Sequence, residues 1–220
     1  MRDARSPGPR RGMTVTGPQL GRPVGADAEQ TRARIIAAAM RCVAETGRTR
    51  ATIREIARAA DMTSGSLYHY FANKSELLEA TVGEMDRIAL PRLRAAAAQA
   101  DTVVDRLAAV LDESSRLMRD YPDLAAFERA MRVIGHEHGD RRRPPGPNAL
   151  RDIISEIIGD ARAQGALPAG TDPGGVVNAI HALARGLTER AAGLDPGAYA
   201  TTLDSAKMLL RGTLFTGGPQ

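Results

Sequence analysis

Apolar residues recur along most of this chain at the spacing of an α-helix. In the first such stretch, Ile35, Ala39, Cys42 and Val43 fall on one face. No stretch alternates apolar and polar residues for long enough to indicate a strand. The pattern predicts an all-α protein, with helices over residues 27–46, 53–60, 64–71, 73 or 75–97, 101–120, 122–138, 149–164, 173–192 and 196–215.

Residues that commonly cap helices lie at the ends of these stretches. Thr52 precedes one helix and has Glu55 three positions later, which is the spacing of a capping box. Asp172 and Asp195 each precede a proline, a residue favoured at the first helical position. Gly47 follows the first helix, where glycine often ends one. The other expected caps are Asp27, Thr63 and either Asn73 or Ser75.

Two segments lack the helical pattern. Residues 1–26 are rich in Arg, Pro and Gly, so we expect a disordered basic extension there, with translation starting at Met1 or Met13. Residues 139–148 contain too many Pro and Gly residues for a helix. The expected division is an extension over 1–26, a three-helix domain over 27–73 and a domain of about six helices over 74–220.

Charge is distributed unevenly along the chain. Residues 1–74 hold 13 Lys and Arg against 6 Asp and Glu, a net charge of +7, whereas residues 75–220 hold 17 against 20, a net charge of −3. A basic N-terminal part suggests a polyanion such as DNA as the partner of that end. The single cysteine, Cys42, lies on an apolar face and is expected to pack there.

The sequence has no feature of a membrane or exported protein. Charged residues interrupt every apolar stretch before it reaches the roughly 20 residues that cross a bilayer. The first 25 residues lack the apolar centre of a signal peptide. We therefore expect a cytoplasmic protein without a membrane partner.

Residues 52–71, TIREIARAADMTSGSLYHYF, have the size and spacing of a helix-turn-helix. Ile56 and Ala57 belong to the inward face of the first helix, and the small Ala57 allows the second helix to cross closely. Met62 is expected to be buried in the turn, and Thr63 to cap the second helix. Such a second helix enters the major groove of DNA with its first residues nearest the bases. Flanking residues then reach phosphates.

The segment from Ile35 to Leu78 closely resembles the DNA-binding domain of the TetR family of regulators. The matching residues are Thr52, Ile56, Ala57, Gly65, Leu67, Tyr68, Tyr70, Phe71 and Lys74. The resemblance implies three DNA-binding helices followed by about six helices of a ligand-binding and dimerisation domain. It also implies a ligand-responsive repressor, which binds a palindromic operator in double-stranded DNA as a homodimer and is released by a small-molecule effector. Activation remains an alternative, because the motif does not encode the sign of regulation.

The resemblance also assigns individual roles. It places at the DNA Thr52, Arg54, Thr63, Ser64, Gly65, Ser66, Tyr68, His69 and Lys74. Leu67 and Phe71 are instead expected in the core of the small domain, because they are apolar. Asp61 stands where the family usually has Gly in the turn, at a position where φ can be positive; Asp tolerates this better than most residues. Ser64 stands where the family often has Lys, which implies different operator contacts.

In the family, the last two helices pack against those of a second copy as a four-helix bundle. Two apolar stripes in the last two predicted helices fit this arrangement. The expected dimer residues are Val176, Ile180, Leu183, Leu187, Leu203, Ala206, Leu210 and Leu214. Burial of both stripes within one subunit is the alternative. We favour the dimer, because two recognition helices on a two-fold axis match a palindromic operator.

The effector is expected to bind among the fourth to eighth helices. Only 3% of the residues are aromatic, so an aliphatic or small polar effector fits better than a flat aromatic one. Candidates to orient a polar effector are Arg116, Arg132, His136 and His181, each with a surface or core role as its alternative. His136 and His138 diverge if they lie on one helix, so no metal is expected. No cofactor is expected either.

Two other classes of function fit the sequence less well. The chain lacks the motifs of common hydrolase, nucleotide-binding and zinc sites, so we do not expect an enzyme. Turnover of a candidate ligand by the purified protein would contradict that expectation. An architectural DNA-binding protein using the basic N-terminus would bind without sequence preference, whereas a footprint with half-sites favours a regulator.

Overall fold

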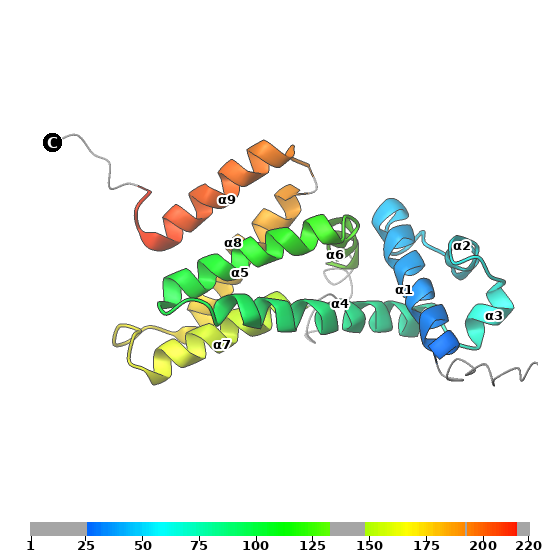
Figure 1. Ribbon diagram of the computed structural model, residues 1–220, viewed down its shortest axis with the longest axis horizontal. Coiled ribbons are helices and arrows are strands. Elements are labelled where there is room, and N and C mark those ends of the chain that lie inside the picture. Colours follow the sequence, from blue (N-terminus) through cyan, green and yellow to red (C-terminus); the bar gives the residue numbers. More distant parts are fainter. Residues whose placement is uncertain (1–25, 133–147, 192, 215–220) are drawn as a thin grey trace, which may run out of the picture.

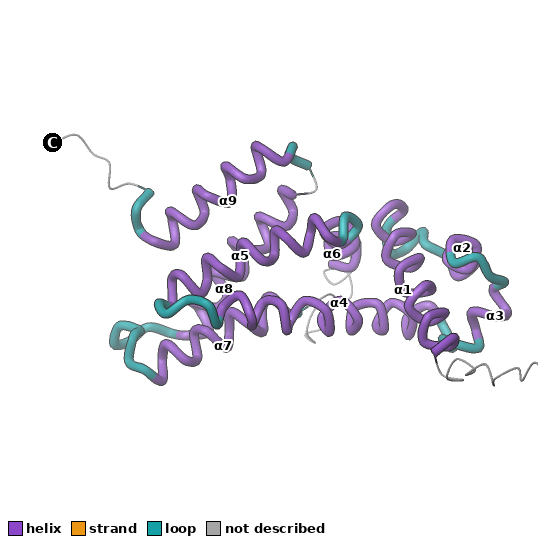
Figure 2. The backbone as a smooth tube through the Cα atoms, in the orientation of Figure 1, coloured by secondary structure: helices purple, strands orange, loops and turns teal. Residues whose placement is uncertain are grey.

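The computed structural model describes residues 26–132, 148–191 and 193–214. The helices in these ranges are α1 (Ala26–Thr46), α2 (Ile53–Ala59), α3 (Ser64–Tyr68), α4 (Lys74–Ala97), α5 (Val103–Asp120), α6 (Leu124–Arg132), α7 (Ala149–Ala163), α8 (Pro173–Ala191) and α9 (Pro196–Arg211). Figure 2 shows helices and loops in the described ranges, without a strand. The prediction of an all-α fold with an N-terminal helix-turn-helix is therefore confirmed.

The helices form two groups along the long axis of the molecule (Figure 1). α1, α2 and α3 gather at one end, and α5, α7, α8 and α9 lie at the other. α4 extends from the first group into the second, where it packs against α5 and α7. α6 packs against both α1 and α8. α4 and α6 therefore both connect the first group to the second.

Each group has its own hydrophobic core. The smaller core is formed by α1 to α4 and includes the fully buried side chains of Ile35, Ile56, Leu67 and Leu77. The larger core is formed mainly by α4 to α9. Cys42 is half-buried and packs against both cores, as its apolar setting predicts. Burial raises the pKa of the Cys42 thiol, which fits a packing role.

Most of the predicted caps are present. Asn73 precedes α4, and its side chain accepts from the backbone N–H of Glu76 at 2.9 Å, which decides between Asn73 and Ser75. Asp172 accepts from the first amides of α8 at 2.8 and 3.1 Å, and Asp195 accepts from those of α9 at 3.0 Å. These bonds satisfy amides that have no partner within their own helix.

Several predicted helix bounds need correction, among them that of α5, which begins at Val103 and not at residue 101. α1 begins at Ala26, so Asp27 lies in its first turn and is not the cap. α9 ends at Arg211 because Gly212 closes the helix with a φ of 68°, and it does not extend to residue 215. The predicted helix over 122–138 is described only as α6, which begins at Leu124; residues 133–138 lie outside the described ranges, as do residues 139–147 of the predicted loop.

α3 is also shorter than the apolar pattern predicts. It ends at Tyr68, three residues before Phe71. Leu67 and Phe71 are both buried, as predicted, and the backbone N–H of Phe71 donates to the carbonyl of Leu67 at 3.1 Å. The apolar spacing continues past the helix because the following turn returns Phe71 to the same core.

α4 supplies the cap of α7. Asn148, which precedes α7, makes no capping bond with its own side chain. Asp86 on α4 replaces it, because its Oδ1 accepts from the backbone N–H groups of Asn148 at 2.7 Å and Ala149 at 2.8 Å. The middle of α4 is thereby joined to the start of α7.

Charged side chains hold the second half of α4 against α5. Glu113 on α5 is only 9% exposed. It accepts from Arg92 on α4 and from Arg116 on α5, each at 2.6 Å. Burial acts to raise the pKa of Glu113, but the hydrogen bonds from Arg116 and Arg92 outweigh it and lower that pKa. Arg92 also pairs with Asp120 at 2.7 Å, so one arginine joins α4 to two points on α5.

No helix in the described ranges has both the length and the apolar character that a membrane span requires.

Candidate nucleic-acid interface

α2 begins at a capping box. The hydroxyl of Thr52 accepts from the backbone N–H of Glu55 at 3.2 Å, and the Glu55 carboxylate accepts from the backbone N–H of Thr52 at 2.9 Å. The Thr52 hydroxyl also donates to the same carboxylate at 2.9 Å. These bonds lower the pKa of Glu55, the backbone bond from Thr52 having the largest effect. The Thr52 hydroxyl therefore already has hydrogen-bond partners within the protein.

The turn between α2 and α3 depends on Asp61. Its φ is 55°, in the left-handed region, which agrees with the expected positive φ at this position. The chain then returns toward α2, because the backbone N–H of Met62 donates to the carbonyl of Ala57 at 3.0 Å. Met62 is half-buried against the smaller core and not fully buried as predicted, since the turn leaves one side of it open.

α3 presents a short polar N-terminus. Thr63 caps it, with its hydroxyl accepting from the backbone N–H of Ser66 at 3.1 Å and lying 2.9 Å from the Ser66 hydroxyl. Gly65 has an ordinary helical backbone and is exposed. The fold brings Ser64, Gly65 and Ser66 together at the open end of α3, as predicted.

Exposed and basic side chains surround this end of α3. Tyr68 is 53% exposed, and His69 is exposed beside it. Arg54 and Arg58, both on α2, border an open groove that also reaches Ser64. Arg58 is missing from the predicted site, although its spacing of four residues from Arg54 on one helical face signals it. The region thus combines hydroxyls, an exposed aromatic side chain and guanidinium groups.

Lys74 is directed into the protein. Its Nζ donates to the backbone carbonyl of Arg48 and, at 3.3 Å, to that of Thr49. Burial lowers the pKa of Lys74, and the charge of Arg48 lowers it further. The ammonium that the family resemblance places at the DNA therefore has partners in the loop between α1 and α2.

Residues 35–81 match the model of the family described as "Bacterial regulatory proteins, tetR family". This range contains α2, the turn and α3, which form the interface described above. This segment of the chain therefore belongs to the TetR family. This is a family of transcriptional regulators, which agrees with the expectation that the chain is not an enzyme.

Individual TetR-type regulators match parts of the chain. The regulator TtgR of Pseudomonas putida is 41% identical over 59 residues, which are 27% of this chain and 28% of TtgR. The repressor Rv1474c of Mycobacterium tuberculosis is 29% identical over 141 residues, 58% of this chain and 73% of the repressor. The match to TtgR thus spans less than a third of either protein.

The fold is similar to that of solved structures over most of its length. FadR from Bacillus subtilis, in complex with stearoyl-CoA, aligns with a TM-score of 0.68. The alignment covers 82% of this chain and 98% of FadR at 20% identity. At this identity the likeness shows the fold, including the helices beyond the TetR family model.

A small cavity of about 50 Å³ lies among α4, α5, α6, α7 and α8. Apolar side chains such as Leu93 and Leu117 form much of its wall, and polar ones complete it, namely Ser114, Tyr121, Glu128, His181, Arg185 and Thr188. Of the predicted effector residues, His181 lies in this lining. Arg185 and Thr188 follow His181 at helical spacing on α8, whereas Ser114, Tyr121 and Glu128 reach the cavity from other segments of the chain, which sequence patterns did not indicate.

Of the other predicted effector residues, the structure describes the side chain of Arg116 alone. Arg116 is absent from its lining, because the Arg116 guanidinium pairs with Glu113. His136 and the side chain of Arg132 lie outside the described residues. Within the described ranges, no group of three or more His, Cys, Asp or Glu side chains is placed to hold a metal ion.

The predicted dimer residues face largely into their own subunit. Leu187, Leu203 and Ala206 are buried in the larger core. The half-buried ones are Val176, Ile180, Leu183, Leu210 and, beyond the end of α9, Leu214. Burial within one subunit, the stated alternative, accounts for the buried positions of both stripes.

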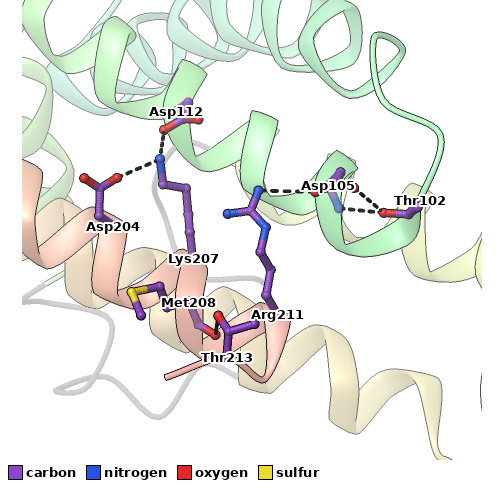
Figure 3. Close-up of polar contacts among 8 residues, drawn as sticks. All are labelled: Thr102, Asp105, Asp112, Asp204, Lys207, Met208, Arg211 and Thr213. Atoms are coloured by element: carbon purple, nitrogen blue, oxygen red, sulfur yellow. Dashed lines mark hydrogen bonds and ion pairs between the residues drawn. The ribbon is translucent and has the colours of Figure 1, made fainter. Parts of the chain in front are cut away.

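Ion pairs fix which face of α9 is exposed (Figure 3). Lys207 pairs with Asp112 on α5 and with Asp204 on α9, each at 2.9 Å, and Arg211 pairs with Asp105 on α5 at 3.2 Å. These contacts hold one side of α9 on α5. On the exposed side are two large apolar side chains: Met208 is 41% exposed and Leu209 is 48% exposed.

Proposed function

We propose that this TetR-family protein is a ligand-responsive repressor that binds a palindromic DNA operator as a homodimer and is released by a small-molecule effector. The observation that carries the proposal is the open N-terminus of α3, with Ser64, Gly65 and Ser66 exposed or half-buried beside exposed Tyr68 and His69. A recognition helix with this presentation fits the major groove.

The residues proposed to contact DNA fall into two groups, those near the base edges and those near the phosphates. Ser64, Gly65 and Ser66 lie nearest the base edges, where hydroxyls can donate or accept. Phosphates on either side are contacted by Thr63, Tyr68 and His69, together with the guanidinium groups of Arg54 and Arg58. Base contacts then specify the operator, and phosphate contacts set affinity and orientation.

The second copy binds on the outward faces of α8 and α9. Met208 and Leu209 provide exposed apolar area on α9. On α8, exposed Ala179 and Ala182 allow a close approach of a partner helix. This dimer differs from the one predicted by sequence in its residues, because Leu187, Leu203 and Ala206 are already buried. A two-fold axis between the copies places two recognition helices on one palindrome.

The effector binds at the cavity beside α4. FadR of Bacillus subtilis is known in complex with stearoyl-CoA. A long acyl chain does not fit a cavity of about 50 Å³ unless the surrounding helices separate. We therefore propose a small effector with an apolar body and one polar group near His181 and Arg185, in a lining that is largely apolar.

Release follows from the position of α4. The cavity wall includes Met85 and Ile88 on α4, whose first residue, Lys74, follows the helix-turn-helix. An effector that displaces α4 changes the separation of the two recognition helices. By linkage, operator weakens effector binding by the factor with which effector weakens operator binding. A regulator of this kind acts where the bacterial chromosome lies, in the cytoplasm.

The experiment that tests the proposal is selection of bound sequences from a random duplex library by the purified full chain. We expect enrichment of one palindrome by the wild type and loss of that enrichment in Tyr68→Ala. Thermal unfolding is the control: the Tyr68 side chain is more than half exposed, so the melting temperature stays unchanged. Binding without sequence preference, or no binding, would contradict the proposal.

A further inference from the structure

The loop between α1 and α2 is a compact turn held at both ends. The chain reverses at Gly47, whose φ of 84° ends α1 in the left-handed region. The backbone N–H of Ala51 then donates to the carbonyl of Gly47 at 3.1 Å, and the Ala51 side chain is fully buried. Arg48 and Arg50 lie within this turn, Arg48 half-buried and Arg50 exposed.

Lys74 connects this turn to α4. It is the first residue of α4 and lies 26 positions beyond Arg48 in the chain. Its ammonium donates to the carbonyls of Arg48 and Thr49, the middle of the turn. A lysine ammonium has three hydrogens to donate, so two of its bonds are made within the protein.

Positive charge gathers at this turn. Among neighbouring charges, Arg48 has the largest effect on Lys74 and disfavours its charged form. The next is Glu55, which favours it, but the Glu55 carboxylate is bonded to both the backbone and the hydroxyl of Thr52. The like charges of Arg48 and Lys74 repel each other, and a polyanion at the turn would relieve that repulsion.

We propose that Lys74 is a positioning residue, which holds the turn between α1 and α2 so that Arg48 and Arg50 contact the DNA backbone beside the recognition helix. The turn is suitably placed, because it leads directly into Thr52 and α2, whose Arg54 and Arg58 border the groove that reaches α3. The inference rests on the proposed DNA binding. It adds a second basic segment to the interface and changes the role of Lys74.

The first test is made without DNA. Amide hydrogen exchange of residues 47–51 is compared between the wild-type full chain and Lys74→Met. We expect faster exchange in the variant, because the carbonyls of Arg48 and Thr49 lose their donor. A lysine that served only as a phosphate contact would leave the exchange of this turn unchanged, and that result would overturn the inference.

The second test measures operator affinity against salt concentration for Lys74→Met, Arg50→Ala and the double variant, using the selected palindrome. Each lost phosphate contact lowers the slope of log affinity against log salt by about 0.9. We expect Arg50→Ala to lower it by about that amount, Lys74→Met by at least as much, and the double variant by no more than Lys74→Met.

Arg162→Met is the charge control, because Arg162 is exposed on α7 and its removal also takes one positive charge. Its slope is expected to equal that of the wild type. Additive losses in the double variant, or no effect of Arg50→Ala, would overturn the inference while leaving the proposed function intact. Failure of the wild type to bind any duplex would overturn both.

Discussion

Single residues in the helix-turn-helix serve either the fold or a partner, and the structure separates the two roles. Asp61 serves the fold, because its left-handed backbone makes the turn. Gly65 does not, because its backbone is ordinary and a Cβ added there would meet only the Thr63 hydroxyl, at an ordinary 3.7 Å. A glycine that the fold does not require is consistent with the close approach of DNA.

The first prediction concerns Gly65→Ala. Alanine is favoured over glycine in a helix by about 1 kcal/mol, so thermal unfolding should show equal or higher stability. The added methyl group projects from the face proposed to meet DNA, so operator affinity should fall at least about tenfold. Gly159→Ala is the matched control: Gly159 lies in α7 with open space around it, so the stability gain should come without a change in operator affinity. Full operator affinity in Gly65→Ala would refute a close approach at this position.

Asp61 gives a second prediction at this scale. Asp61→Val should lower the free energy of unfolding by about 1–2 kcal/mol, because a β-branched residue is strained at a φ of 55°. Asp61→Gly should not show that loss and should be at least as stable as the wild type. Urea unfolding of the three proteins gives the order, and equal midpoints for Val and Gly would show that the turn adapts.

At the scale of elements, α4 is the helix that the others hold in place. Its first half packs with α1 and the small core, and its second half is paired with α5 through Arg92. Between these regions, Asp86 caps α7. Apolar periodicity indicated α4 and α7 separately, but the bond between them depends on the fold, because Asp86 and Asn148 are 62 residues apart.

Asp86→Ala should destabilise the protein by about 0.5–2 kcal/mol, the usual effect of losing a cap. The start of α7 would lose the acceptor for two amides, and amide exchange at residues 148–150 should rise. Asp86→Asn keeps an acceptor oxygen, so it is expected to retain most of the stability. Equal losses of stability in the two variants would instead show that the negative charge of Asp86, and not its acceptor oxygen, is responsible.

Glu113 should make the free energy of unfolding depend on pH. Its folded-state pKa lies below the ordinary value of 4.5, so its pairs stabilise the protein above that pH, and this contribution is lost as the pH falls through the lowered folded-state pKa. At pH 7, Glu113→Gln should lower the free energy of unfolding by about 1–2 kcal/mol, since a buried charge-assisted bond is weakened. The difference from the wild type should shrink below pH 4.5, and unfolding curves at pH 7 and pH 4 measure it. A difference independent of pH would assign the loss to packing.

At the scale of the whole molecule, the two groups of helices make a DNA-binding end and a body joined by α4 (Figure 1). The ion pairs of Lys207 and Arg211 turn one side of α9 toward α5. The opposite side carries Met208 and Leu209, which is why the proposed dimer uses that side.

Leu209→Arg tests the proposed dimer. Two copies of the new charge would meet near the two-fold axis, so sedimentation should show a monomer at concentrations where the wild type is a dimer, and operator affinity should fall with it. Ser155→Arg, at an exposed site on α7, is the control and should sediment as the wild type does. An unchanged dimer in Leu209→Arg would place the interface elsewhere.

The sequence by itself determined the helices, most of their caps and the helix-turn-helix. These depend on residues within a few positions of one another, as in the capping box of Thr52 and Glu55 or the left-handed Asp61. The sequence prediction was wrong where the local pattern and the tertiary packing diverge. The apolar spacing extends to Phe71, but α3 ends at Tyr68.

Only the tertiary structure decided which face of each helix is covered. The stripe of Leu187, Leu203 and Ala206 has the same periodicity whether a second subunit or its own core buries it. Likewise, no local signal directs Lys74 to the carbonyl of Arg48 or places His181 in one cavity with Met85 of α4. Contacts between residues far apart in the chain depend on how the helices pack, and apolar spacing along one helix carries no information about its neighbours.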